Sequence, residues 1–411
     1  MSDRLDDGGS GPLRGVRVLE YGDLVNAPYA AKILADLGAD VLKIERPGTG
    51  DRSRAVGPFP DDEENPEASG LFLYLNGRKR GVTLDLSSAR GREMFDELLV
   101  STDILIENAT VREFSELGLS PERLRALNDR LIHLSITPFG HTGPYASFKG
   151  YGLNAAAMSG VPLSLGWPDR SPLPMPDFLE DFFVGVVGAM SCMLALWGSE
   201  QDQRGEWVDL SGAETWMTYQ AGLSVLTWLF GTRQARREGW RRTGGPYPSS
   251  VMHCSDGEMR VVAVTMREWR RFLDVMGTPA WSADPRFQDR LKMNELYADE
   301  LDALIHPWLM ARTKSQLMET FYEAGVPFTP IKDFGDVYED PHLRARGFFV
   351  ATQHAGIGPL EMPGAPYHFA NDDLPLWEAA PALGQCNEEV FEGQLGMTSS
   401  DLSALREAGV I

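Results

Sequence analysis

The first half of the chain alternates short apolar runs with longer segments whose apolar residues recur at helical spacing. We expect strands at residues 16–19, 41–44, 82–86, 103–106, 131–136 and 207–210. Helices are expected between them at residues 28–37, 89–99 and 121–127, the first with Asn26 as its candidate N-cap and Gly38 as its end. This alternation predicts a parallel β-sheet covered by helices, that is, an α/β fold.

A nearly continuous apolar segment at residues 182–197 interrupts the alternation. It is shorter than a typical membrane span, contains two glycines and a serine, and follows Glu180 and Asp181. We therefore interpret it as a buried core helix. A second long helical stretch is expected at residues 213–230.

The pattern changes again beyond residue 233. Residues 234–245 are rich in arginine and glycine and are expected to form a loop or linker, and the Asp256-Gly257 turn before residues 259–264 signals a hairpin. Helices expected at residues 267–276, 296–304 and 314–324 complete a smaller α+β domain. Residues 331–411 carry many prolines and glycines and then two short helices.

Composition narrows the classes of function. Of the 411 residues, 43% are hydrophobic and 24% are charged, as in a globular protein of two or three domains. The net charge of -21 argues against nucleic acid and against anionic membranes as partners, although a few local cations can still bind a small anion. Three cysteines without a CxxC motif, and an acidic tail at residues 1–10 without a signal-peptide pattern, favour a cytoplasmic location.

The familiar cofactor motifs are absent from the sequence. The first strand-to-helix turn, residues 22–28, lacks the GxGxxG fingerprint of dinucleotide-binding folds. Neither a Walker A motif nor a GxSxG elbow occurs, and the seven histidines are scattered without metal-ligand spacing. We therefore expect no metal.

Asp181 is the one carboxylate in an unusual place, at the start of the apolar helix. As an N-cap it needs no further explanation, because aspartate is among the best capping residues. The same position suits a nucleophile, because a helix N-terminus stabilises an anion and a carboxylate can attack a thioester. On these residues alone the capping role is favoured.

Motifs along nearly the whole chain resemble the family III CoA-transferases. They are, in order, residues 34–47 (LADLGADVLKIERP) with Gly50, Asp51 and Arg54, then 75–80 (LNGRKR), 106–108 (IEN), 139–144 (FGHTGP), 181–185 (DFFVG), 194–196 (LAL), 205–211 (GEWVDLS), 325–327 (GVP), 340–341, 346–347 and 381–384 (PALG). Asp181 falls where that family carries its catalytic aspartate.

The resemblance implies a mechanism and an assembly. Asp181 would attack a donor acyl-CoA to give a mixed anhydride, the CoA thiolate would turn this into an aspartyl-CoA thioester, and an acceptor carboxylic acid would leave as the new thioester. Coenzyme A enters as a substrate, and no tightly bound cofactor is implied. Also implied is an obligate homodimer of interlocked chains, each with a Rossmann-like large domain (residues 1–200 and 351–411), a linker helix (201–234), a small domain (235–330) and a second linker (331–350).

The resemblance also implies contacts with coenzyme A. The matching positions are Val25, Asn26, Arg46, Leu84, Leu86, Ser87, Asn108, Ala109, Thr137 and Phe139. Arg46 is the strongest candidate among these positions, because a guanidinium group can bind the phosphates or stack on the face of the adenine. The chain departs from the family pattern at several places: Glu116 replaces a basic residue, Ser87 and Thr137 stand where some members have lysine, Ala109 replaces a ring, Gln385-Cys386 replaces Glu-His, and Glu180 replaces a frequent glycine.

Two alternatives stay open. An α-methylacyl-CoA racemase would need a His-Asp pair for proton abstraction, but the matching stretch, residues 149–154, offers Tyr151 and Asn154, which are poor bases. A non-catalytic acyl-CoA-binding homologue is the other alternative, and the intact Asp181 argues against it. The acceptor acid cannot be read, since five tryptophans within residues 197–240 suit core packing as well as an apolar pocket.

Overall fold

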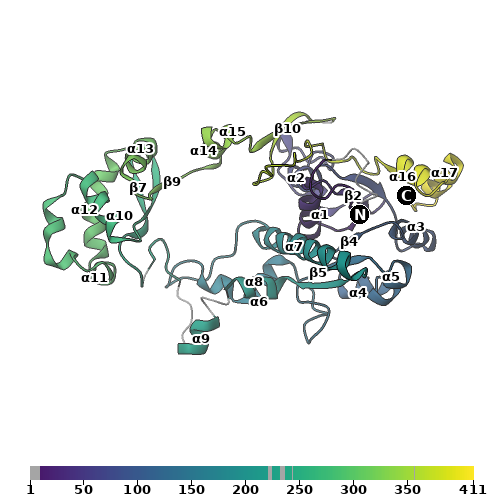
Figure 1. Ribbon diagram of the computed structural model, residues 1–411, viewed down its shortest axis with the longest axis horizontal. Coiled ribbons are helices and arrows are strands. Elements are labelled where there is room, and N and C mark those ends of the chain that lie inside the picture. The colour runs from purple at the N-terminus through teal and green to yellow at the C-terminus, as the bar shows by residue number, and fades with distance from the viewer. Residues whose placement is uncertain (1–9, 221–224, 232–236, 243, 356) are drawn as a thin grey trace. The chain divides into compact units, whose positions relative to one another are not determined.

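The computed structural model describes residues 10–220, 225–231, 237–242, 244–355 and 357–411. The chain divides into two compact units. Unit 1 contains the described residues up to Pro162 together with Pro174–Arg233 and Ala345–Ile411, and unit 2 contains Leu163–Leu173 and Gln234–Arg344 (Figure 1). The longer segment of unit 2 starts close to the predicted start of the small domain, at residue 235, and ends beyond its predicted end at residue 330. The shorter segment, Leu163–Leu173, comes from earlier in the sequence.

Unit 1 is built on a six-stranded parallel sheet with the strand order β3-β2-β1-β4-β5-β6. Its strands are β1 (Arg17–Tyr21), β2 (Asp40–Glu45), β3 (Arg80–Thr83), β4 (Ile104–Glu107), β5 (Ile132–Thr137) and β6 (Trp207–Ser211). Every residue of β4 and β5 is buried, as expected for strands covered on both faces. The predicted α/β fold with a parallel sheet is confirmed; only β3 ends earlier than predicted, so that Leu84 and Leu86 follow it.

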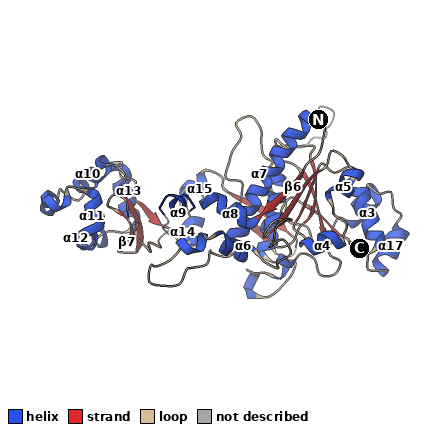
Figure 2. Cartoon of the chain, turned by 90° about the horizontal axis from the view of Figure 1, so that it is seen from below, coloured by secondary structure: helices blue, strands red, loops and turns tan. Residues whose placement is uncertain are grey.

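Helices cover both faces of the sheet, and Figure 2 shows α7 on one side with α3 and α5 on the other. The helices of unit 1 are α1 (Asn26–Asp36), α2 (Gly70–Asn76), α3 (Ala89–Leu99), α4 (Val111–Glu116), α5 (Pro121–Leu127), α6 (Gly152–Ser159), α7 (Leu179–Asp202), α8 (Gly212–Gln220), α9 (Leu226–Gly231), α16 (Asn387–Gly393) and α17 (Ser399–Glu407). Val390, Phe391 and Leu402 from the last two join the core beneath β2 and β3. The end of the sequence thereby completes the domain formed by its beginning.

Small residues let α7 lie close to α1 and to the sheet. A Cβ on Gly185 would stand 2.7 Å from the carbonyl oxygen of Asn26, and one on Gly188 would stand 3.1 Å from Leu134. Larger residues at these positions would push the two helices apart. This approach brings the first turn of α7 beside the first turn of α1.

The opposite face of α7 is exposed in the single chain. Its exposed apolar side chains are Val186, Met190, Met193, Leu194 and Trp197. By length and composition α7 could cross a membrane, and 33% of its most apolar stretch is buried. The prediction of a buried core helix is therefore right for one face and wrong for the other.

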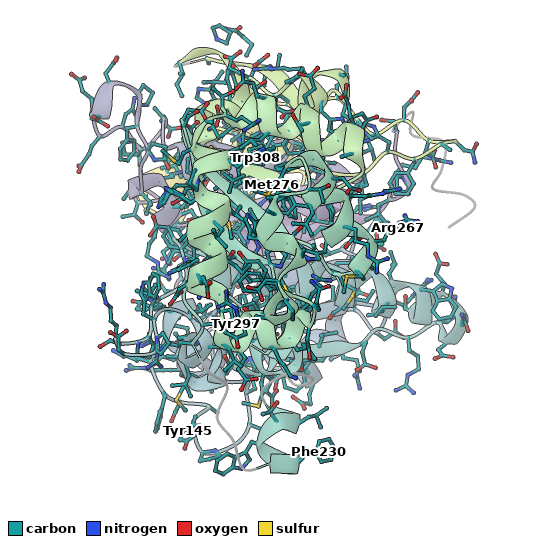
Figure 3. All side chains as sticks on the ribbon, turned by 90° about the vertical axis from the view of Figure 1, so that its left-hand side faces the viewer. Tyr145, Phe230, Arg267, Met276, Tyr297 and Trp308 are labelled. Atoms are coloured by element: carbon teal, nitrogen blue, oxygen red, sulfur yellow. The ribbon has the colours of Figure 1, made fainter. Side chains whose placement is uncertain are left out.

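Unit 2 contains a three-stranded antiparallel sheet packed against helices. Its strands are β7 (Ser249–Cys254), β8 (Gly257–Val262) and β9 (Thr329–Ile331), and the predicted hairpin is confirmed between β7 and β8. Its helices are α10 (Met266–Val275), α11 (Arg290–Leu296), α12 (Ala298–Met310), α13 (Lys314–Ala324) and α14 (Phe334–Tyr338). Met276, Tyr297 and Trp308, labelled in Figure 3, pack against its aromatic core around Phe272 and Phe321.

Some elements have no clear signal in the sequence. The hairpin of β10 (Phe349–His354) and β11 (Gly358–Pro363) is only half-buried, so its residues do not alternate cleanly between apolar and polar. The five-residue helix α15 (Pro341–Ala345) buries no side chain. The predictions for residues 1–9 and for parts of 213–230 and 234–245 lie outside the described residues.

Candidate active site

A cavity in unit 1 lies at the carboxyl ends of β1 and β4, where the strand order reverses. Open parallel sheets bind their ligands at this point, because the loops after the two central strands diverge there. The cavity has a volume of about 610 Å³ and is lined by the loops after β1, β2, β4 and β5 and by the first turns of α6 and α7. A volume of this size suits a small organic ligand or part of a larger one.

Asp181 lies in the wall of this cavity as the third residue of α7. The N-cap is Phe178, in a left-handed conformation and without a side-chain cap, so the capping interpretation of Asp181 is wrong. Oδ1 of Asp181 accepts a hydrogen bond of 2.7 Å from Nδ2 of Asn26, whereas Oδ2 has no hydrogen-bond partner among the described residues. Burial raises the pKa of Asp181 to about 6, although the bond from Asn26 opposes this rise.

A short series of side-chain amides leads from the backbone to Asp181. Oδ1 of Asn26 accepts from Nδ2 of Asn108 and from the amide of Ala27, each at 2.8 Å. Asn108 is fixed in turn by the backbone of Asp23, whose amide donates to its Oδ1 and whose carbonyl accepts from its Nδ2. Asn26 is the first residue of α1, and Val25 occupies the N-cap position, so the predicted capping role of Asn26 is also wrong.

Buried charges fix the turn that carries these amides. Nζ of Lys43 lies 2.7 Å from Glu20 and 2.7 Å from Asp51, and all three side chains are fully buried. Oδ1 of Asp51 accepts from the amide of Leu24, which has a positive φ of 62° that a branched side chain rarely adopts. Burial opposes the charge on Lys43, but the carboxylates of Asp51 and Glu20 outweigh it and raise the pKa of its ammonium group.

Lys79 extends this buried cluster on its far side. Its Nζ donates to the carbonyl of Pro28 and to Asn76, and it forms an ion pair of 2.7 Å with Glu20. Burial lowers the pKa of Lys79 to about 8. The turn before α1 is thus tied to β2 and to the loop before β3 by charges that water does not reach.

Gly152, in the first turn of α6, lies directly against the carboxyl group of Asp181. A Cβ at this position would lie 2.3 Å from Oδ2 of Asp181 and 2.5 Å from Cγ of Glu180. Only glycine therefore allows the first turn of α6 to lie so close to the carboxyl group. Glu180 itself is buried, its Oε2 has no hydrogen-bond partner among the residues that the structure describes, and burial raises its pKa.

Four cationic side chains also line the cavity: Arg46, Arg52, Arg112 and Lys149. Arg52 pairs with Asp23 at 2.5 Å, Arg112 with Glu116 at 2.7 Å, and Arg46 with Glu113 at 3.6 Å. For Lys149 no ion pair is found within the described parts of the chain. In a strongly acidic protein, these cations are the candidate contacts for an anionic ligand.

The structure brings together about half of the residues predicted to contact coenzyme A. Asn26, Arg46, Asn108, Ala109 and Thr137 line the cavity with Asp181. The remaining five do not: Val25, Leu84 and Leu86 are buried, Phe139 is half-buried, and the hydroxyl of Ser87 donates to Asp85. Their role in binding stays a prediction.

Sequence reasoning missed Gly152, Lys149 and Arg112 as residues of the cavity wall. The Gly150-Tyr151-Gly152 spacing in residues 149–154 was a usable signal for a close backbone approach. Among the described residues, no three histidine, cysteine or carboxylate side chains gather as a metal site requires. The groups at hand are therefore a carboxylate, amide donors and guanidinium groups.

Fold and site together define a Rossmann-like α/β protein whose switch-point cavity holds a half-buried carboxylate in place of a dinucleotide fingerprint. The sequence matches the model of CoA-transferase family III over residues 13–387. This chain belongs to the family III CoA-transferases, and the resemblance seen in its motifs is confirmed.

Similar proteins agree with this assignment. The chain is 31% identical over 408 residues to the succinyl-CoA–D-citramalate CoA-transferase of Chloroflexus aurantiacus, covering 97% of this chain and 98% of that protein. It is 30% identical over 424 residues to the formyl-CoA:oxalate CoA-transferase of Streptomyces coelicolor, covering 97% and 99%. A crystal structure of a CaiB/BaiF family protein from Brucella suis superimposes with a TM-score of 0.84 at 27% identity, covering 94% of this chain and all (100%) of that one.

Proposed function

We propose that this protein moves coenzyme A from an acyl-CoA donor to a free carboxylic acid, with Asp181 as the covalent nucleophile. The observation that carries the proposal is the carboxyl group of Asp181 in the cavity wall: Asn26 holds one of its oxygens, and the other has no hydrogen-bond partner in the described part of the chain. A carboxylate held in this way is a usable nucleophile toward a thioester carbonyl.

The chemistry balances without a metal, an oxidant or a net proton. Oδ2 of Asp181 bonds to the thioester carbon and the C–S bond breaks, which gives a mixed anhydride and CoA thiolate. The thiolate then bonds to Cγ of Asp181, and the Cγ–Oδ2 bond breaks to release the donor acid. The acceptor carboxylate then bonds to Cγ and the Cγ–S bond breaks, which gives a second anhydride and CoA thiolate. This thiolate bonds to the acyl carbon of the acceptor, and the bond from that carbon to the bridging oxygen breaks, which releases the new acyl-CoA and restores the Asp181 carboxylate.

The cationic group in the cavity wall is the proposed site for the phosphates and adenine of coenzyme A. The side chain of Arg46 is half-exposed. A guanidinium group can bind a phosphate through two parallel hydrogen bonds or stack on a base. The relatives named above and others act on succinyl-CoA or formyl-CoA. Succinyl-CoA is therefore the first donor to test, with dicarboxylic acids as the first acceptors.

A homodimer is part of this proposal. The exposed apolar face of α7, from Val186 to Trp197, is the kind of surface that a second copy of the chain covers. Light scattering at micromolar concentration should give twice the mass of the chain, and a folded monomer would contradict the proposal.

The racemase alternative gains no support from the site. Oδ1 of Asn154 accepts from the amide of Tyr151, and the pair caps the start of α6 instead of presenting a base. Purified protein in deuterated water should therefore leave the α-proton of a 2-methylacyl-CoA unexchanged. Incorporation of deuterium at a catalytic rate would favour the racemase.

The test of Asp181 is covalent trapping. Incubation with a competent acyl-CoA but no acceptor should build up an activated aspartyl group, which hydroxylamine converts into a hydroxamate on the peptide that contains Asp181. The isosteric variant Asp181→Asn should bind acyl-CoA but fail to transfer, because an amide is a far weaker nucleophile than a carboxylate. The matched control is Asp177→Asn, which neutralises an exposed carboxylate outside the cavity wall. Substantial transfer by folded Asp181→Asn would overturn the mechanism and direct attention to Glu180.

A further inference from the structure

The side-chain amide of Asn26 can take only one orientation. Its Oδ1 receives two donors, Nδ2 of Asn108 and the amide of Ala27. A flipped amide would place its NH₂ group against both donors, at a loss of two hydrogen bonds. Asn108 cannot flip either, because the backbone of Asp23 engages its oxygen and its nitrogen. Nδ2 of Asn26 is therefore committed to donating toward Asp181.

The two oxygens of Asp181 have different fates during transfer. Oδ2, the unpartnered oxygen, is the atom that bonds to an acyl group, so Oδ1 becomes the carbonyl oxygen of each anhydride and of the aspartyl thioester. Whenever a thiolate or a carboxylate attacks Cγ, the negative charge of the tetrahedral intermediate develops on Oδ1. The N–H group that already lies 2.7 Å from Oδ1 belongs to Asn26.

We infer that Asn26 is a catalytic residue: it is the oxyanion donor for the two half-reactions in which Cγ of Asp181 is itself attacked, and Asn108 is its positioning residue. This inference rests on the proposed function and adds to it the group that stabilises charge on the enzyme's own carbonyl. A donor that is already fixed in place stabilises a developing oxyanion far more than it stabilises a ground-state carbonyl, because nothing needs to reorient during the reaction.

This role differs from the coenzyme A contact that the resemblance suggests for Asn26. A group that contacts only the substrate would, when removed, raise KM with kcat unchanged, whereas loss of an oxyanion donor lowers kcat. In Asn26, Oδ1 already accepts two hydrogen bonds and Nδ2 already donates one. A contact with coenzyme A would therefore use the second N–H of Nδ2. The kinetic split between KM and kcat thus separates the two roles.

The sharpest variant is Asn26→Asp. It keeps an oxygen acceptor for Asn108 and Ala27 and the shape of the side chain, but removes the donor to Asp181. Asn26→Ala removes the donor without adding charge. Each should lower kcat for transfer by about 10²-fold, the usual effect of deleting one oxyanion donor, and should leave KM for acyl-CoA within about threefold. Asn371→Ala, which deletes an exposed amide in the same unit, is the matched control and should be fully active.

A pH profile adds a readout that a merely structural role would not move. The bond from Asn26 stabilises the ionised form of Asp181, so its loss should raise the pKa of that carboxyl further. The acid limb of kcat/KM should therefore shift to higher pH in Asn26→Ala and stay in place in Asn371→Ala.

The outcomes separate this inference from the proposed function. Wild-type protein that yields no hydroxamate on Asp181 defeats the proposed function and the inference with it. If the hydroxamate forms but a folded Asn26 variant keeps kcat within threefold of wild type, or changes only KM, the inference is overturned and the proposed function stands. If Asn26→Ala does not fold, Asn26→Asp, which retains the bonds from Asn108 and Ala27, decides alone.

Discussion

Two groups of polar side chains in the cavity wall are held in opposite ways. In the first group, Asn26, Asn108 and Asp181 are half-buried, are joined by hydrogen bonds of 2.7–2.8 Å and rest on a cluster of fully buried charges. In the second group, Arg46 and Arg112 have side chains that are 58% and 84% exposed, and each pairs with a glutamate. The first group is fixed by hydrogen bonds and partly shielded from water, and the second is solvated.

This difference separates catalysis from affinity. Fixed and partly buried donors act strongly on charge that appears only during the reaction, because they need not reorient and because water screens them less than it screens exposed groups. Exposed arginines attract and hold an anionic substrate, but solvent and salt screen them, so each contributes less. Changes in the hydrogen-bonded group and its buried charges should therefore have large effects on stability and rate, and changes to the exposed arginines should have small, salt-dependent effects on binding.

The largest expected effect is on stability, from Lys43→Met. The substitution leaves the buried carboxylates of Glu20 and Asp51 facing each other without their shared cation. Breaking a buried ion pair by removing one partner typically destabilises a protein by about 3–5 kcal/mol. Urea unfolding followed by circular dichroism should show this loss, whereas Arg90→Met, at an exposed pair with Glu93, should change little. Equal stability of the two variants would show that the buried cluster is not what holds the first turn.

The next effect concerns the stability of Asp181→Asn as a function of pH. Burial raises the pKa of Asp181 from 3.8 to about 6, so the folded protein resists ionising it. The wild type therefore loses stability as pH rises through this range. The difference between the two pKa values, 3.8 and about 6, corresponds to about 3 kcal/mol of unfolding free energy. The neutral amide avoids that loss.

Folded Asp181→Asn should therefore be inactive yet up to about 3 kcal/mol more stable than wild type above pH 6, with the gain vanishing below about pH 4. Thermal unfolding measured from about pH 3.5 to about pH 8, a range that spans both pKa values, tests this gain in stability. Asp177→Asn, at an exposed carboxylate, should show no such pH-dependent gain. A variant that is less stable than wild type at neutral pH would contradict the desolvation of Asp181.

The sequence predicts the sheet and the candidate nucleophile for clear physical reasons. Short apolar runs such as residues 131–136 are typical of strands buried on both faces, and the carboxyl ends of such strands are where open parallel sheets bind ligands. The position of Asp181 in a family motif adds the reactive group. These are local patterns, and local patterns are what a single sequence displays.

The hydrogen-bonded group of the site depends on the path of the backbone and could not be predicted in this way. Asn26 and Asn108 meet although 82 positions separate them, and they meet only because β1 and β4 are neighbours in the sheet. The start of α7 was also misplaced, because it depends on a left-handed Phe178 that no residue type signals. The exposed face of α7 has the composition of a core helix, so composition alone could not show which face is covered.

A moderate effect is expected from Gly152→Ala. The added methyl group would need to stand 2.3 Å from Oδ2 of Asp181, so either the carboxyl group or the first turn of α6 must move. Displacing a reacting atom by about 1 Å can lower a rate by about 10²-fold, and we expect a loss of about 10–100-fold in kcat. Gly393→Ala is the control, since a Cβ there meets nothing within 4 Å. Full activity in Gly152→Ala would show that the close contact with Oδ2 is not needed for transfer.

The smallest effect is expected from Arg46→Ala, in the exposed group. Arg46 already interacts with Glu113 and with Tyr21, so it must give up part of these contacts to bind a phosphate or a base. We therefore expect the dissociation constant for coenzyme A to rise about fivefold, or about 1 kcal/mol, while kcat for saturating substrate stays near the wild-type value. Isothermal titration calorimetry at two salt concentrations measures this, and the difference from wild type should shrink at high salt because exposed charges are screened. Arg125→Ala, which removes an exposed arginine on α5 outside the cavity wall, is the matched control for the change in net charge. If Arg46→Ala lowered kcat by as much as the Asn26 variants do, the division of the cavity wall into a catalytic group and a binding group would be wrong.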